Sequence, residues 1–297
     1  MNKFNYLFLI GLLTALSCPF FADEPVLKIW QNNVATAYAL DEVDSITFDN
    51  VVAPEQPAAF SVSRNKTVTF ATGNLRYVIS DSAWLFAENQ YDIVGVRNMV
   101  ESQFADTIDL FAWSTNANPM SAWGVTLLDN DSLFNGDFVD WGKNFGDGNT
   151  WRTLTASEWE YLRASRKNAA NLIGVGAVNG MNGLIILPDN WECPEGLTFK
   201  KGFSSEEYSY TAFAEHQSYT ADEWEVMEKA GAVFLPCAGF RMGTSLAYMQ
   251  LGGLYWTSSV STYGTRFASY FLLMSDGAGV GNDMRSGGNA VRLVRDL

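Results

Sequence analysis

Histidine is almost absent from this sequence, whose 297 residues include only His216. One imidazole cannot provide the two- or three-histidine ligand sets of zinc and iron sites. A serine triad would need His216 together with a nucleophile elbow, and no Gly-x-Ser-x-Gly segment occurs. We therefore expect His216 to lie in a polar surface loop, and we expect no histidine-based catalysis.

Basic side chains are also scarce, with 19 Lys and Arg against 33 Asp and Glu, a net charge of −14. Such a surface repels nucleic-acid phosphates and anionic lipid heads. We expect no nucleic-acid partner, and contact with a membrane only through a lipid anchor. The acidity suits a solvated surface, and the alternative is that it serves to bind a divalent cation.

Cysteine occurs three times, the first time at Cys18. Residues 1–17 contain one Lys, a short apolar run and then small residues, which is typical of an export signal. The tripeptide Ala-Leu-Ser before Cys18 is similar to a bacterial lipobox, which predicts a lipoprotein of the cell surface or outer membrane, anchored at Cys18. Simple cleavage at the same bond would instead release a periplasmic or secreted protein.

The other two cysteines, Cys193 and Cys237, leave two possibilities open. In an oxidising compartment they could form a disulfide, which would add roughly 3–5 kcal/mol by the chain-entropy estimate. They could equally remain free thiols that pack as small hydrophobic side chains. Their spacing does not decide between the two, because a disulfide depends on local geometry.

The chain is 47% hydrophobic and 14% aromatic, which indicates a folded protein. Residues 26–39 and 40–48 contain short alternating strands and form a small β segment within 18–57. Two prolines in 51–57 indicate a linker. The main domain is expected at 58–297.

Two capping boxes predict two short helices. Thr155 with Glu158 begins a helix over about 156–166, and Thr220 with Glu223 begins another, which Gly231 ends. The tryptophans of both helices are expected to pack in the core.

Alternating or continuous apolar runs predict strands between and around these helices, and Asn-Gly pairs at 179–180 and 182–183 indicate a turn. The glycine-rich segment 277–281 lacks the Lys-Ser/Thr of a phosphate loop and is expected to be a turn. The pattern favours an α+β domain with a mostly antiparallel sheet. The predicted strands are 60–63, 67–70, 75–79, 84–91, 184–187, 232–235, 254–256, 267–274 and 290–295.

Two segments are candidate binding sites. The first is the loop-rich region 114–150, whose acidic residues could hold calcium, although Leu133 stands where an EF-hand would place its third ligand. Its candidate ligands are Asp129, Asp131, Asp137, Asp140 and Asp147.

The second candidate is 258–289, which mixes the Tyr, Ser, Asn and Arg of adaptable recognition surfaces. The alternative is a set of ordinary turns around an amphipathic strand. The candidate ligand-binding residues are Ser258, Ser259, Tyr263, Arg266, Ser269, Tyr270, Asp276, Asn282, Asp283 and Arg285.

The phrase at 152–161, Arg-Thr-Leu-Thr-Ala-Ser-Glu-Trp-Glu-Tyr, resembles formylglycine-generating, sulfatase-modifying-factor proteins. Further phrases, in their order along the chain, resemble the Fibrobacter-type major paralogous domain of exported bacterial surface proteins. These phrases lie at 73–77, 86–92, 182–191, 231–236, 255–259 and 291–296.

The resemblance implies a C-type-lectin-like fold over 58–297, with its C-terminal part as the exposed binding face. Formylglycine generation would require a cysteine pair near the C-terminal end, but 256–297 contains none. We therefore expect a non-catalytic surface protein that binds a glycan or a host or phage protein and needs no cofactor, although calcium stays possible. Two further functions stay open, namely a structural subunit of a surface assembly and a divergent glycan-processing enzyme.

Overall fold

The computed structural model describes residues 26–31, 34–39, 57–99, 106–116, 134, 136–145, 151–243 and 245–297. The chain divides into two units, 1–56 and 57–297, one residue from the expected boundary. In the first unit, β1 (Val26–Gln31) and β2 (Val34–Ala39) form the predicted antiparallel hairpin. The export signal, Cys18 and the strand expected at 40–48 lie outside the described residues.

The second and the last strands of the second unit lie side by side. The sheet order is β3-β4-β18-β8, with antiparallel pairing throughout. Phe70 of β4 is paired with Val294 of β18, so the two ends of this unit share one sheet. The strands are β3 (Phe60–Ser63), β4 (Lys66–Phe70), β18 (Leu293–Asp296) and β8 (Arg152–Thr153).

A second four-stranded sheet is buried at the centre of this unit, in the order β11-β9-β10-β12. Only β11 and β9 pair in parallel. The strands are β9 (Ile173–Val178), β10 (Met181–Ile186), β11 (Ser218–Tyr219) and β12 (Val233–Pro236).

The sequence analysis did not predict β9, which is buried along its whole length and contains two glycines. Both are required by close neighbours: a Cβ on Gly174 would lie 2.5 Å from the Lys200 carbonyl oxygen, and one on Gly176 would lie 2.7 Å from Gln217 Cγ. Glycine inside a strand often marks such a close approach, which period-two alternation does not reveal.

Both predicted capping boxes are confirmed. Thr155 caps α2 (Ala156–Glu160) and Thr220 caps α4 (Ala221–Lys229), in each case with the reciprocal glutamate bond. The first helix differs from prediction, because it continues from 161 as a π-helical turn, η4 (Tyr161–Ser165). A third helix, α3 (Ala212–His216), was not predicted and ends at the histidine expected in a loop.

The C-terminal part of the unit is an antiparallel meander of β15 (Gly252–Val260), β16 (Phe267–Met274) and β17 (Gly277–Met284). The strand predicted at 267–274 is confirmed, but the turn expected at 277–281 is wrong. Its glycines belong to β17, where a Cβ on Gly281 would lie 2.7 Å from the Tyr270 ring. The missing side chain therefore makes room for an aromatic ring on the neighbouring strand.

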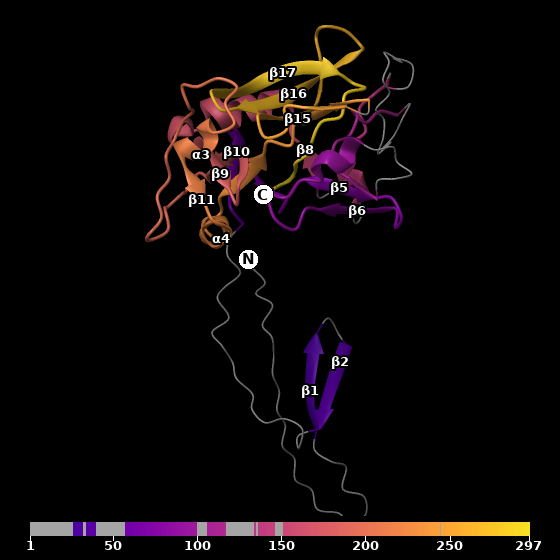
Figure 1. The fold of residues 1–297 in the computed structure, drawn as a ribbon. Coiled ribbons are helices and arrows are strands. Elements are labelled where there is room, and N and C mark those ends of the chain that lie inside the picture. Colours follow the sequence, from indigo (N-terminus) through magenta and orange to yellow (C-terminus); the bar gives the residue numbers. More distant parts are fainter. Residues whose placement is uncertain are drawn as a thin grey trace, which may run out of the picture. The chain divides into compact units, whose positions relative to one another are not determined.

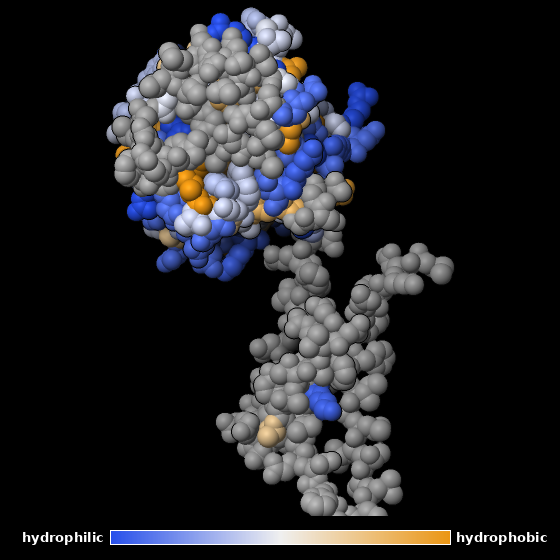
Figure 2. Space-filling view, turned by 90° about the vertical axis from the view of Figure 1, so that its right-hand side faces the viewer, coloured by the Kyte–Doolittle hydropathy of each residue, from blue (hydrophilic) through white to orange (hydrophobic). Residues whose placement is uncertain are grey.

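The remaining elements are short. On the side of the unit opposite α3, β11 and α4 lie β5 and β6 (Figure 1). The coloured surface on that side is mostly hydrophilic, with small separate hydrophobic spots (Figure 2). The complete set of remaining short elements, on all sides of the unit, is β5 (Leu75–Val78), β6 (Ala83–Phe86), β7 (Thr107–Ile108), β13 (Phe240–Met242), β14 (Ser245–Ala247), and the 3-10 helices η2 (Gly95–Met99), η3 (Trp141–Asn144) and η5 (Ala169–Asn171).

The architecture confirms an α+β domain with mostly antiparallel strands. Among the described residues, no helix is both long enough and apolar enough to cross a membrane.

A buried cation lies in the core between the sheets. Arg292 is 1% exposed, and its guanidinium donates to Asn74 Oδ1 at 3.0 Å, the Ala71 carbonyl at 3.2 Å and the Phe234 carbonyl at 2.8 Å. Burial lowers the pKa of Arg292 to about 10, so the side chain remains charged at neutral pH. Because a buried charge is costly unless hydrogen-bonded, this network is strictly required by the fold.

Replacing Arg292 with Met should reduce the free energy of unfolding by about 3–5 kcal/mol, because three buried acceptors lose their donor. Chemical denaturation measures this change. The control is Arg64→Met at an exposed position, which should change stability by no more than about 0.5 kcal/mol. Equal effects of the two substitutions would contradict the role of the network.

The first capping box is also part of an ion-pair network. Arg152 donates to both carboxylate oxygens of Glu158 at 2.8 Å and also pairs with Asp296 of β18. Burial by itself would raise the pKa of Glu158, but the hydrogen bonds from Arg152 and Thr155, with the charges of Arg152 and Lys66, together lower it. The segment 152–161, which carries the family resemblance, thus joins α2 to β18.

Because the pKa of Glu158 is lowered on folding, its contribution to stability is present above the unfolded pKa of about 4.3 and is lost as the pH falls through the folded value. Glu158→Gln, which keeps a capping side chain, should lose about 1.5 kcal/mol at pH 7. The difference from wild type should shrink below about pH 4. Urea titrations across this range, with Glu195→Gln as the exposed control, test the prediction; a gap independent of pH would refute it.

Candidate functional site

The ten residues predicted to bind a ligand lie along the β15–β17 meander, but the structure does not bring them together. Tyr263, 77% exposed, and Arg266 lie in the turn between β15 and β16, while Asp276 lies in the turn at the other end of β16. A strand of eight residues separates these turns by about 25 Å. Tyr270 is half-buried, with its ring against Gly281.

The serines of this group make contacts within the fold. Ser259 Oγ accepts a hydrogen bond from the backbone N–H of Ala156, at the start of α2. Ser269 is buried and donates to Asn282 Oδ1 across the β16–β17 pair at 3.2 Å. Ser258 is half-buried on β15. These contacts agree with the alternative interpretation, in which the segment consists of ordinary turns around an amphipathic strand.

The two remaining charged candidates are also held by the fold. Arg285 is buried, stacks on Trp113 at 4.4 Å and donates to the carbonyl of Phe134 at 3.1 Å. Asp283 accepts from Asn289 Nδ2, and burial raises its pKa. Ligand binding by the meander stays a prediction, and its exposed candidates are Tyr263, Arg266, Asp276 and Asn282.

The proposed calcium ligands are only partly described. Asp140 Oδ1 accepts from the N–H of Gly142 and from the N–H and hydroxyl of Thr153, so this carboxylate caps η3 and holds β8. Asp137 is exposed. In the part of the chain that the structure describes, no three His, Cys, Asp or Glu side chains converge as metal ligands. Asp129, Asp131 and Asp147 lie outside the described residues.

Of the two possibilities for the cysteines, the structure has the free thiols. Cys193 is exposed and Cys237 is buried, where burial raises the pKa of the Cys237 thiol. His216 is half-buried, with Nε2 3.2 Å from the Lys200 carbonyl oxygen. Burial, followed by the charge of Lys200, lowers the pKa of His216.

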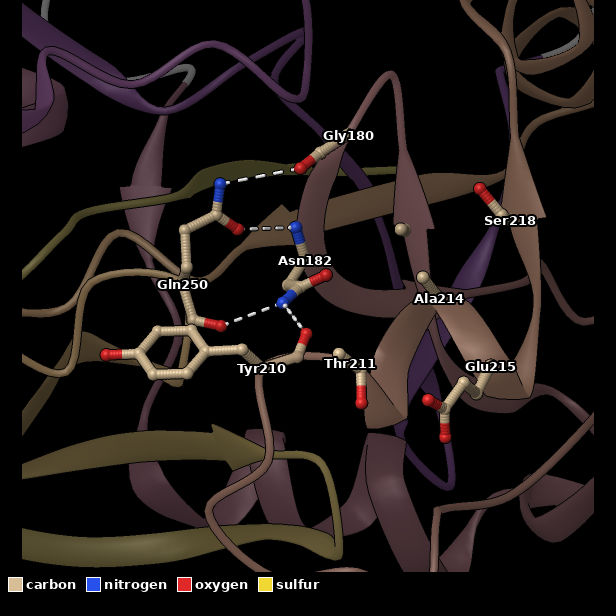
Figure 3. Close-up of a pocket in the computed structure, with 9 residues that line it drawn as sticks. Gly180, Asn182, Tyr210, Thr211, Ala214, Glu215, Ser218 and Gln250 are labelled. Atoms are coloured by element: carbon tan, nitrogen blue, oxygen red, sulfur yellow. Dashed lines mark hydrogen bonds between the residues drawn. The ribbon is translucent and has the colours of Figure 1, made fainter.

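A pocket of about 530 Å³ opens beside the central sheet, where β9, β10 and β11 meet α3 (Figure 3). Sequence analysis did not predict it. Small residues form its walls, and polar groups from several elements point to its interior or rim. The lining residues are Ala177, Gly180, Asn182, Tyr210, Thr211, Ala214, Glu215, Ser218 and Gln250.

Asn182 is the central polar group of this pocket and is only 6% exposed. Its Nδ2 donates to the backbone carbonyls of Tyr210 at 2.8 Å and Gln250 at 2.9 Å, which uses both N–H donors. This assignment leaves Oδ1 directed toward the Ala214 side of the pocket (Figure 3), and none of the described residues donates to it. The pocket therefore presents a fixed acceptor that a ligand can reach.

Gln250 holds Asn182 in place at a conformational cost. Its Oε1 accepts from the Asn182 N–H at 2.9 Å, and its Nε2 donates to the Gly180 carbonyl at 3.4 Å. Gln250 has a φ of 65°, in the left-handed region that side chains other than Gly and Asn rarely adopt. Such conformations persist only where the surrounding bonds hold the residue in place, and they are frequent at ligand sites.

Besides Tyr210, two further exposed tyrosines, Tyr208 and Tyr248, are each two residues from a residue that lines the pocket. Tyr210, 58% exposed, lines the pocket, and Tyr208 is equally exposed. The rings of Tyr208 and Tyr248 are 6.2 Å apart, and both residues have positive φ, 53° and 59°. Positive φ at a residue other than glycine is uncommon, and such residues are frequent at ligand sites.

The Asn-Gly pair at 182–183 was expected to form part of a turn, but both residues lie within β10. The turn is at the preceding pair, where Asn179 and Gly180 have φ of 49° and 79°. Gly183 is required because a Cβ there would lie 2.4 Å from the Leu235 carbonyl oxygen. The signal that could have revealed the site is a polar Asn followed directly by the apolar run of a buried strand.

Comparisons of the chain with protein-family models, curated proteins and solved structures found no match.

Asn182→Asp should destabilise the protein by about 1–3 kcal/mol at neutral pH, because a carboxylate oxygen would face the carbonyls of Tyr210 and Gln250 in place of the N–H donors. Asn179→Asp is the control, since Asn179 is exposed in the turn and Asp tolerates its left-handed backbone. Thermal and urea unfolding of both variants measure the difference. Equal stabilities would show that the Asn182 amide orientation is incorrect.

Proposed function

We propose that this protein is an exported, non-catalytic binding protein, lipid-anchored at Cys18 on the cell surface, and that its Asn182 pocket recognises a glycan. The observation that carries the proposal is the buried Asn182 amide, whose two N–H groups are used internally while its oxygen is directed into the pocket. A preformed polar group of this kind in a concave site provides ligand orientation.

The lining chemistry favours a ligand rich in hydroxyl groups. Asn182 Oδ1 and the Glu215 carboxylate are acceptors, and the hydroxyls of Thr211 and Ser218 can both donate and accept. Sugar hydroxyls provide the matching donors and acceptors. Exposed tyrosine rings such as Tyr210 can pack against the apolar C–H face of a sugar ring, because aromatic side chains combine a large apolar surface with a polar edge.

Binding without catalysis agrees with the number of acids in the pocket. Glycoside hydrolysis by the usual mechanisms needs two carboxyl groups on either side of the bond that is cleaved. Glu215 is the only acidic residue among the nine that line the pocket. One carboxylate can orient a hydroxyl group but cannot serve as both the acid and the base or nucleophile.

The finer fold that we propose is C-type-lectin-like. Three features support it: the ends of the second unit pair as β4 and β18, two capped helices are present in α2 and α4, and the C-terminal part is an antiparallel meander. The family resemblance implies a binding face on the C-terminal meander. The Asn182 pocket that we propose is a different site.

A glycan array probed with the purified full chain tests the proposal, once with calcium and once with chelator. We expect binding of a set of related glycans that is insensitive to chelator. Glu215→Gln should weaken it about tenfold, because a charge-assisted hydrogen bond of roughly 1.5 kcal/mol is lost. Glu195→Gln, a charge-matched exposed control, should bind as wild type does.

A blank array, or binding unaffected by Glu215→Gln, would overturn the assignment of this pocket. Binding lost on Tyr263→Ala but retained in Glu215→Gln would place the glycan on the meander instead. Binding lost with chelator would favour the acidic loop.

A further inference from the structure

A second hollow, separate from the Asn182 pocket, has a volume of about 420 Å³ and is lined by two arginines. Arg76 comes from β5 and Arg97 from η2, and the Thr107 hydroxyl on β7 adds a donor. Two guanidinium groups at one hollow are notable in a chain with a net charge of −14. An anion in the hollow would interact favourably with both positive charges.

Arg76 has unused hydrogen-bonding capacity. It is half-buried, and its Nε is shielded from solvent yet has no hydrogen-bond partner among the described residues. A buried N–H without an acceptor is uncommon in native proteins and calls for an explanation such as an unfilled ligand site.

The backbone beside Arg97 is held rigidly. Asp109 is buried, and its two oxygens accept from the Val94 N–H at 2.7 Å and Asn98 Nδ2 at 2.8 Å. Arg241 Nη1 donates to the Asn98 carbonyl at 3.0 Å. These bonds fix the residues on both sides of Arg97, so its Cα is positioned before any ligand binds, which reduces the entropic cost of binding.

Acidic side chains also lie near the hollow. Arg76 and Arg241 both interact electrostatically with Asp109. Asp109 thus provides one negative charge near the positive charges of Arg76, Arg241 and Arg97. Asp106 accepts a hydrogen bond from the Ser80 N–H and Asp92 accepts one from Asn89 Nδ2, so these two carboxylates keep their charge but are held by other groups.

We propose that the Arg76–Arg97 hollow binds the anionic group of an acidic sugar, either a carboxylate or a sulfate ester. The two arginine side chains and the Thr107 hydroxyl that line the hollow favour an anion. That a sugar carries it rests on the proposed function. Arginine suits both groups, because its planar fork donates two parallel hydrogen bonds to two oxygens of one anion.

Calorimetric titration of the purified full chain tests this with four probes: inorganic sulfate, glucuronate, glucose 6-sulfate and glucose. We expect the two acidic sugars to bind with millimolar affinity or better and to compete with inorganic sulfate. Arg97→Gln and Arg76→Gln should each weaken binding about tenfold, since each removes a charge-assisted bond. Arg64→Gln, at an exposed position in the turn between β3 and β4, should leave it unchanged.

Arg97 is exposed, so Arg97→Gln should fold normally, and circular dichroism checks this. Arg76→Lys keeps the charge but not the fork, and it should bind more weakly than wild type. Absence of sulfate and acidic-sugar binding in wild type, or equal weakening by Arg64→Gln, would overturn the proposal. Binding of sulfate without either acidic sugar would refute the sugar assignment alone. Each result is independent of Glu215→Gln, which tests the Asn182 pocket.

Discussion

The buried guanidinium of Arg292 is the constraint on which the second unit depends. It holds the connection after β4 through Ala71 and Asn74, and the central sheet through Phe234. Asn74 in turn donates to the Tyr255 hydroxyl, which donates to the Pro236 carbonyl. A cation in a low-dielectric core needs all of these oxygens in place at once, so segments far apart in sequence are held in one arrangement.

The Asn182 pocket is connected to this core. Tyr255 bonds to the Pro236 carbonyl at the end of β12, and the next residue, Cys237, donates its N–H to the Asn182 carbonyl at 2.7 Å. The Cys237 carbonyl also accepts from the N–H of Gln250, the residue whose side chain orients Asn182. The strained backbone at Gln250 is thus supported by bonds that lead back to the buried network, which is how a rigid scaffold keeps a binding group in place.

Local sequence chemistry predicted the elements whose cause is local. A capping box contains its own donors and acceptors within four residues, so the starts of α2 and α4 could be predicted from Thr155 and Thr220. The strand at 267–274 was recognisable from its run of apolar residues. In contrast, Gly174 and Gly176 of β9 and Gly281 of β17 make room for neighbours on other elements, and no local pattern shows those neighbours.

By itself, the sequence determined the α+β class, the two helix starts, several strands and the exclusion of histidine-based metal chemistry, because all of these follow from composition or from contacts between near neighbours. Only the tertiary structure decided which polar residues are free to meet a ligand. Ser259, Ser269 and Arg285 form bonds within the fold, whereas Asn182 and Arg76 keep unused hydrogen-bonding capacity. Hydrogen-bond partners are set by three-dimensional packing, and residue type alone does not specify them.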